Sequence, residues 1–441
     1  MSNVELGLWS FPVLLALIFL RMPIGLAMLV VGVVGNYLIT KSWNPSLSLF
    51  KSLPFSTFSS YSLSVVPLFL LMGQFASLGG ISKQLFDAAA SWLGHRRGGV
   101  AMAAIGACAG FGAICGSSLA TAATMGQIAL PELRKHGYSG ALATGTIAAG
   151  GTLGILIPPS VILVIYAVLT EGNIAQLFMA AMVPGILAAV GYIIAIAVTV
   201  RLRPTWAGSP YPRISYGARL LLLARIWPVL LIFFLVIGGI YLGWFTPTEA
   251  AAIGAAGTAI IAYVRGGLTR HNIVDALLQT AKVTGMIFLI ILGAAALNNF
   301  LALSQLPQAA VSFVVEQGFN PWAILIVMLL FYLVLGCFMD SLSMILLTIP
   351  IFYPIVLALD FGLTPRDFGL WFAILVLVVV EVGLITPPVG MNLFVINSMS
   401  KGTTLGETYV GVLPFVVSDF VRTVILVAFP IISLFLVHWL F

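Results

Sequence analysis

Long apolar runs separated by short polar segments extend from one end of this chain to the other. Most runs have about 20 residues, enough for a helix to cross the hydrocarbon core of a bilayer. The predicted spans of the first half are 6–20, 23–39, 61–78, 139–169 and 174–200. Those of the second half are 227–243, 247–264, 284–303, 368–399 and 409–441. The pattern predicts an all-α polytopic membrane protein.

Two of these runs are interrupted by adjacent prolines, Pro158-Pro159 and Pro387-Pro388. A proline removes a backbone N–H and clashes with the preceding turn, so neither run is one continuous helix. Inside a membrane the freed carbonyls need a neighbouring helix, water or a cation as partner. Discontinuous helices at matching places in two halves are typical of a transport site near the bilayer midplane.

Further landmarks repeat in the same order and at nearly constant spacing in the two halves. Pro23, Ser118 and Pro184 in the first half match Pro247, Ser341 and Pro414 in the second. The sequence therefore predicts two structural repeats, 1–205 and 227–441, joined by a basic cytoplasmic linker, 206–226.

Each half also contains a Gly-containing segment that we interpret as a re-entrant helical hairpin, at 98–133 and 320–360. With five crossings per half, an odd number, the second repeat is inverted relative to the first. Basic residues flank the first hairpin, which places it on the cytoplasmic side, whereas the second contains no Lys or Arg and is expected to face the periplasm.

The composition supports a membrane protein and excludes several other classes. Of 441 residues, 61% are hydrophobic and 7% are charged, against about 25% charged in soluble domains. The net charge of +6 forms no patch suited to nucleic acid, and three cysteines fit neither a disulfide framework nor a zinc site. No nucleotide-binding loop is present, so transport by this chain is not expected to use ATP directly.

The hairpins and breaks together offer the oxygen atoms that a sodium ion needs, from carbonyls and hydroxyls. The first predicted site comprises Gly112, Ser117, Ser118, Gly154 and Pro158. The second comprises Gly336, Asp340, Ser341, Ser343, Thr386 and Pro387. Substrate is expected at Ser118, Pro159, Ser341, Pro388 and Asn392. The alternative is that the small residues only allow tight helix packing.

Two acids lie deep in the predicted membrane region. Asp340, at the second hairpin tip, binds sodium directly or organises the tip, because a carboxylate there needs a compensating partner. Glu381 lies shortly before the second break, where capping of an interrupted helix is the alternative to a site role. Glu249, next to Pro247, is expected at a helix N-terminus.

At these positions the chain resembles the large, DctM-like membrane subunit of TRAP (tripartite ATP-independent periplasmic) transporters. The resemblance covers nearly the whole chain and is carried by GSSLATA (116–122), LPEL (130–133), GTLGILIPPS (151–160), TPTEAA (246–251) and EVGLITPPVGMNL (381–393). Cys115 departs from the family, which more often has serine there, and this puts an ion-ligand role for its side chain in doubt.

The resemblance implies an elevator-type transporter, not an enzyme, in the bacterial inner membrane. Sodium ions would drive uptake of an organic acid such as a C4-dicarboxylate, keto acid or sialic acid, and no organic cofactor is expected. A periplasmic binding protein would deliver the substrate, and a small four-helix membrane subunit would be a separate chain. Two rival hypotheses are a standalone sodium–carboxylate symporter and an intramembrane aspartyl protease that uses Asp340 and Asp419.

Overall fold

The computed structural model describes residues 1–441 and consists of helices without any strand. Six helical segments are long and apolar enough to cross a membrane, and up to eight if two bent pairs each count as one span. The six are Tyr61–Leu78, Ile174–Leu202, Pro247–Val264, Arg270–Ser304, Pro365–Leu384 and Leu405–Ala428. The bent pairs are Gly140–Leu156 with Val161–Thr170, and Tyr216–Ala224 with Trp227–Tyr241. A multi-pass membrane protein follows from these lengths and compositions.

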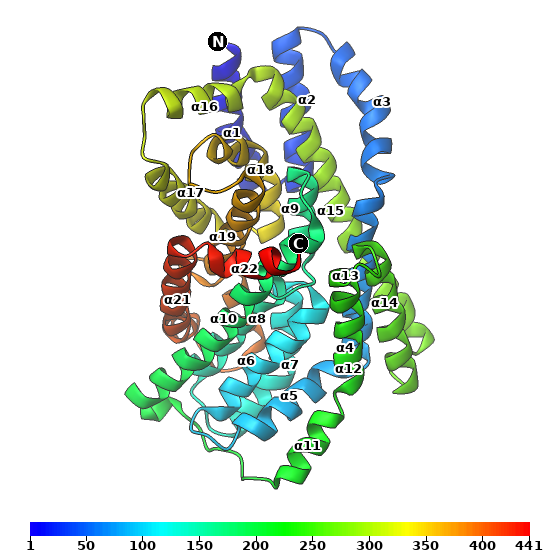
Figure 1. Cartoon of the computed structure of the whole chain (residues 1–441), viewed down its shortest axis with the longest axis vertical. Coiled ribbons are helices and arrows are strands. Elements are labelled where there is room, and N and C mark those ends of the chain that lie inside the picture. Colours follow the sequence, from blue (N-terminus) through cyan, green and yellow to red (C-terminus); the bar gives the residue numbers. More distant parts are fainter.

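One set of helices, the outer group, extends across the top of the molecule and down its right side (Figure 1). Its members are α1 (Asn3–Phe19), α2 (Ile24–Thr40), α3 (Asn44–Phe58), η1 (Tyr61–Ser64), α4 (Val65–Leu78), α12 (Trp227–Phe233), the π-helical turn η3 (Phe234–Gly238), α13 (Gly239–Tyr241), α14 (Pro247–Val264), α15 (Arg270–Ser304) and α16 (Leu306–Glu316).

Helices α2 and α15 pack closely because glycines on α2 face the backbone of α15. A Cβ atom on Gly32 would lie 2.6 Å from the carbonyl oxygen of Ala296. The Asn36 amide donates to Asn299 Oδ1 over 3.2 Å beside this contact. Small residues that let helix backbones approach are the usual means of packing in lipid, where no hydrophobic force drives helices together.

The remaining helices form the inner group, which holds both proline breaks. Its members are α5 (Ile81–Leu93), α6 (Gly99–Cys115), α7 (Ser118–Lys135), α8 (Gly140–Leu156), α9 (Val161–Thr170), α10 (Ile174–Leu202), η2 (Pro204–Trp206), α17 (Pro321–Gly336), α18 (Ser341–Leu357), α19 (Pro365–Ile385), α20 (Met391–Met399), α21 (Leu405–Ala428) and α22 (Ile431–Leu440). In an 18-residue stretch of α19, 94% of the residues are buried, so this helix contacts protein rather than lipid. A short helix, α11 (Tyr216–Ala224), lies at the lower end between the two groups (Figure 1).

The structure corrects several boundaries. The predicted span 409–441 is two helices, since α21 ends at Ala428 and Pro430 precedes α22, which turns away from it (Figure 1). The predicted span 284–303 is the second part of the longer α15. Helices α3, α5, α11 and α16 were not predicted, because they are short or contain too many polar residues to stand out as spans.

In each half, the first helix of the hairpin crosses the broken helix at a pair of glycines. On α6, a Cβ atom at Gly112 would lie 2.6 Å from the Cα atom of Gly154 on α8. On α19, a Cβ atom at Gly383 would lie 2.6 Å from the Cα atom of Gly336 on α17. Both crossings therefore exclude any side chain larger than hydrogen, and they fix each hairpin close to the break of its own half.

We predict that Gly154→Val destabilises the protein by about 1–3 kcal/mol, the usual cost of overpacking. The added side chain would meet the carbonyl oxygen of Ser117, 2.6 Å from the new Cβ atom. Gly285→Val is the matched control, because Gly285 is exposed on α15 with nothing within 4 Å of its Cβ position. Thermal unfolding in detergent measures both, and equal shifts would contradict the close crossing.

Candidate functional site

The first hairpin turns at Gly116, between α6 and α7. Gly116 has φ +65°, a left-handed conformation that glycine adopts without strain. The Ser117 hydroxyl caps α7 by accepting a hydrogen bond from the Ala120 N–H (3.4 Å). A Cβ atom on Gly116 would lie 2.9 Å from the carbonyl oxygen of Pro159, so this tip directly contacts the first break.

The second hairpin turns before α18, and Asp340 caps that helix as Ser117 caps α7. The Ser343 N–H donates to Asp340 Oδ2 (3.1 Å), and the Ser343 hydroxyl donates to Oδ1. A carboxylate at a helix N-terminus is favoured by the helix dipole. Of the two roles predicted for Asp340, the contacts in the structure are those of a residue that organises the tip.

Both breaks expose backbone groups next to a hairpin tip. At the first, Ile157 leaves helical geometry and Ser160 caps α9. At the second, the Thr386 hydroxyl donates to the carbonyl of Val382 (2.6 Å), and the Gly390 N–H donates to the carbonyl of Cys337 in the second hairpin (3.2 Å). The second break is therefore hydrogen-bonded to the second hairpin through Gly390, which satisfies one backbone pair that water cannot reach in a membrane interior.

The two hairpins meet at the carboxyl group of Glu381 on α19. The side chain is 1% exposed, and its Oε1 accepts a hydrogen bond from the Ser341 hydroxyl (2.8 Å). The Ser118 side chain, from the other hairpin, lies beside the same carboxyl group. Glu381 does not cap an interrupted helix, so that alternative is wrong. The residue instead accepts a hydrogen bond from the second tip and lies next to the first.

The predicted substrate residues are only partly brought together. Ser118 and Ser341 are buried beside Glu381, at 3% exposure each. Asn392, fully buried on α20, donates from its amide to the carbonyl of Ala148 on α8 (3.3 Å). Pro159 is buried under the first tip, whereas Pro388 is exposed and its carbonyl accepts from Tyr409.

Several buried oxygens near the tips have no hydrogen-bond donor. These are Thr121 Oγ1, Glu381 Oε2 and Asn392 Oδ1. Thr121 is fully buried on α7 and faces Gly154, so its hydroxyl adds an oxygen atom beside the first predicted sodium site. Sequence reasoning did not single out this residue, although it lies one helical turn after Ser117.

A buried polar network lies behind α8 and was also missed. Arg422 on α21 forms an ion pair with Asp419 (Nη2 to Oδ1, 2.8 Å), and the Tyr192 hydroxyl of α10 donates to Asp419 Oδ2 (2.8 Å). The Thr152 hydroxyl of α8 is 3.0 Å from that of Tyr192. Since Asp419 is engaged here and Asp340 caps α18, the two acids form no catalytic pair.

Residues 11–432 match the profile of the tripartite ATP-independent periplasmic transporter DctM component. The chain belongs to this family. It is therefore a transporter permease and not an enzyme, and the protease hypothesis is wrong.

Named relatives of this TRAP permease cover most of its length. The C4-dicarboxylate TRAP transporter large permease protein DctM of Pseudomonas aeruginosa is 39% identical over 88% of both chains. The sialic acid TRAP transporter large permease protein SiaM of Vibrio cholerae is 31% identical over 96% of both. The isethionate TRAP transporter permease protein DctMQ of Oleidesulfovibrio alaskensis is 30% identical over 88% of this chain and 60% of its own.

Solved transporter structures share the fold at much lower identity. The YdaH transporter of Alcanivorax borkumensis has a TM-score of 0.66 at 14% identity and covers 97% of this permease and 98% of its own chain. MtrF of Neisseria gonorrhoeae has a TM-score of 0.60 at 13% identity, with 97% and 95% covered. These likenesses show a common helical architecture.

We predict that Asp419→Leu destabilises the permease by about 3–5 kcal/mol, because it leaves the Arg422 guanidinium buried without its carboxylate. The double variant Asp419→Leu/Arg422→Met removes both charges and is expected to recover most of that loss. Denaturation in detergent measures both variants. A double variant as unstable as the single one would contradict this account of the network.

Proposed function

We propose that this DctM-family chain carries out sodium-coupled uptake of an organic acid across the bacterial inner membrane, by an elevator mechanism. The observation that carries the proposal is the meeting of both hairpin tips at Glu381, beside two broken helices. Carbonyls, hydroxyls and carboxylates are gathered there from distant parts of the chain, and these are the hard oxygen ligands that sodium takes.

The relatives suggest the class of substrate. Those named above are transporters for a C4-dicarboxylate, sialic acid and isethionate, each an organic anion. Higher identity to the C4-dicarboxylate permease favours a dicarboxylate here. Ser118 and Ser341 would offer hydroxyls to its carboxylates, and Asn392 and Pro159 would complete the pocket.

Inward movement of sodium supplies the free energy that an anion needs to enter against the membrane potential. Moving one positive charge inward is worth about 2.3 kcal/mol per 100 mV, and a monoanion entering alone loses that amount. Two sodium ions move one net positive charge inward with a monoanion; with a dicarboxylate dianion they make transport electroneutral, and the sodium gradient alone drives it. One would bind among Gly112, Ser117, Ser118, Gly154 and Pro158, with Thr121 added. The other would bind among Gly336, Asp340, Ser341, Ser343, Thr386 and Pro387.

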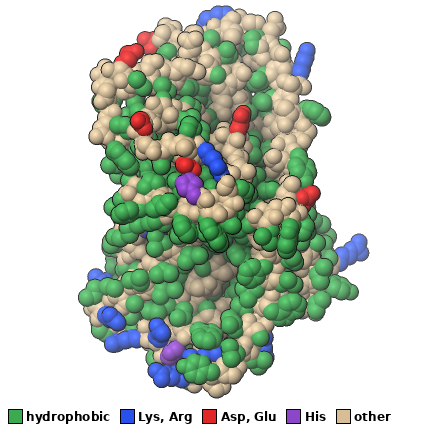
Figure 2. Space-filling view, viewed as in Figure 1, with side chains coloured by type: hydrophobic (Ala, Val, Ile, Leu, Met, Phe, Trp, Pro, Cys, Tyr) green, Lys and Arg blue, Asp and Glu red, His purple; other side chains and the backbone are tan.

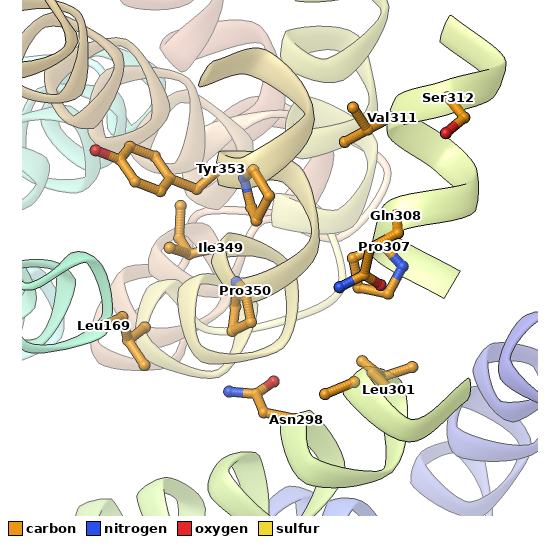
Figure 3. Close-up of a pocket in the computed structure, with 12 residues that line it drawn as sticks. Leu169, Asn298, Leu301, Pro307, Gln308, Val311, Ser312, Ile349, Pro350 and Tyr353 are labelled. Carbon is orange, nitrogen blue, oxygen red and sulfur yellow. The ribbon is translucent and has the colours of Figure 1, made fainter. Parts of the chain in front are cut away.

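The arrangement of helices suggests which parts move. We take 1–205 and 227–441 as inverted repeats joined by the linker 206–226, the outer group as the scaffold and the inner group as the transport domain. A cavity of about 540 Å³ separates α15 and α16 of the outer group from α9 and α18 of the inner group. Figure 3 shows Asn298, Gln308 and Tyr353 around this space. It leaves room for one group to slide past the other.

The partners follow from the family. A periplasmic binding protein would deliver the substrate, and a small four-helix membrane subunit would bind to the outer group as part of the scaffold. The longer DctMQ relative, of which this chain covers 60%, leaves room for such a subunit in its own chain. A standalone symporter remains the rival, and uptake into proteoliposomes without any binding protein would favour it.

We predict that Asp340→Ala and Ser117→Ala each lower sodium-dependent uptake at least about tenfold, because each removes an oxygen and a helix cap at a proposed ion site. Ser52→Ala, at an exposed position of α3, is the control and should leave uptake unchanged. Initial uptake rates across a sodium series measure the effect. Unchanged sodium dependence in both variants would overturn the site assignment.

We predict that Gln308→Trp, which fills the cavity between the groups, lowers the maximal uptake rate about tenfold without lowering the melting temperature, since domain movement limits turnover in such carriers. Gln317→Trp, at the exposed C-terminal end of α16, is the matched control. Equal rates for the two variants would contradict sliding at this boundary.

A further inference from the structure

The lower end of the molecule carries a cluster of cations with no acidic partner. We define the basic cluster as Arg96, Arg213, Arg219 and His95, which lie close enough for the three arginines to act on the histidine. None of the three arginines forms an ion pair or side-chain hydrogen bond in the structure. Figure 2 shows Lys, Arg and His side chains at this end of the molecule and no Asp or Glu on the face in view.

Arg219 is the central residue of the cluster. It lies on α11, is only 7% exposed, and its Nε has no hydrogen-bond partner. The guanidinium carbon is 5.0 Å from the centroid of the Tyr216 ring and 6.0 Å from that of Trp92 on α5. A buried guanidinium without a counter-charge is costly, so an anion from outside the chain is the expected partner.

The acid that contacts Tyr211 is engaged away from the cluster. Glu132 accepts a hydrogen bond from the Tyr211 hydroxyl (3.0 Å) and lies 3.7 Å from the Lys135 amine. Burial and this Glu132 contact raise the pKa of Tyr211, which keeps its hydroxyl a donor. Burial, then the three arginines, lower the pKa of His95, so the imidazole is neutral at pH 7 and adds no charge of its own.

Apolar side chains beside the cluster indicate the source of the anion. On α11, Leu220, Leu221 and Leu223 are exposed at 57%, 58% and 40%, and Tyr216 is exposed at 73%. A short amphipathic helix with exposed leucines and an aromatic residue is typical of the membrane interface. The site therefore combines a phosphate-binding charge with a surface for acyl chains.

We propose that the basic cluster binds the phosphate group of an anionic phospholipid, with Arg219 as its principal ligand and the exposed leucines of α11 against the acyl chains. The guanidinium fork suits a phosphate diester. Anionic headgroups are abundant in the leaflet that basic residues face. This inference is independent of the transport proposal, since binding is measured without substrate.

The test is lipid binding to the full-length chain in neutral detergent, followed by native mass spectrometry with phosphatidylglycerol and, separately, phosphatidylcholine. The wild type is expected to retain phosphatidylglycerol in preference to phosphatidylcholine. Arg219→Gln should weaken phosphatidylglycerol binding about tenfold and Arg219→Lys less, because lysine keeps the charge without the fork. Arg225→Gln, an exposed arginine at the end of the same helix and outside the cluster, is the control and should weaken binding less than Arg219→Gln does.

A second variant and a second measurement also test the proposal. If Arg219→Gln does not fold, the exposed pair Arg96→Gln/Arg213→Gln replaces it, with a loss of about fivefold per arginine expected. Thermal shifts with inorganic phosphate distinguish a free anion from a headgroup. Stabilisation by inorganic phosphate without selective phosphatidylglycerol binding, equal binding of both lipids, or equal losses in the Arg219 and Arg225 variants would overturn the proposal.

Discussion

Peptide groups inside a bilayer have no water to bond with, so every interruption of a helix in this chain depends on a partner from elsewhere in the fold. Each proline break lies against a hairpin tip, and glycine pairs at Gly112–Gly154 and Gly336–Gly383 bring the backbones into reach. The hairpins are therefore needed for the breaks, and the breaks in turn give the tips a polar surface. Neither would be stable alone in an apolar medium.

Glu381 extends the same constraint from backbone to side chains. Its carboxyl group is almost fully buried in a helix that contacts protein on nearly every side, and the hydroxyl that reaches it comes from a hairpin tip. A second buried group, Asp419 with Arg422 and Tyr192, holds α8, α10 and α21 together behind the site. Buried polar groups thus add to the close glycine contacts that pack the inner helices.

Much of the architecture was predictable, since apolar runs indicate membrane spans and proline pairs indicate helix breaks. The two hairpin helices of each half, α6 with α7 and α17 with α18, begin and end close to the predicted segments 98–133 and 320–360. The helix N-terminus at Glu249 was predicted from Pro247, and its capping box with Thr246 confirms it. By contrast, α5 and α11 are short and amphipathic, so no span-length pattern marks them.

The candidate site was less predictable, because its key contacts join positions far apart in the chain. No local pattern indicates that Glu381 lies beside Ser118, or that Thr121 faces Gly154 with an unpaired oxygen. Asp340 was identified because a carboxylate within the membrane needs a compensating partner, and Ser117 because it lies in the Gly-rich tip of the first hairpin; both proved to be helix caps. The contacts between Asp340 and Ser343 are visible only in three dimensions.

The segment that follows α10 forms backbone hydrogen bonds with the loops at both ends of the first hairpin. The Tyr211 N–H donates to the carbonyl of Gly94 (2.9 Å), and the Ser209 N–H donates to the carbonyl of His136 (2.7 Å). If the hairpin travels, these bonds carry the segment with it, and the chain from Tyr211 to Trp227 has to absorb the displacement. An extended chain spans at most about 3.3–3.6 Å per residue, so the much shorter connection from Leu78 of α4 to Ile81 of α5 limits the displacement between the two groups more than this tether does.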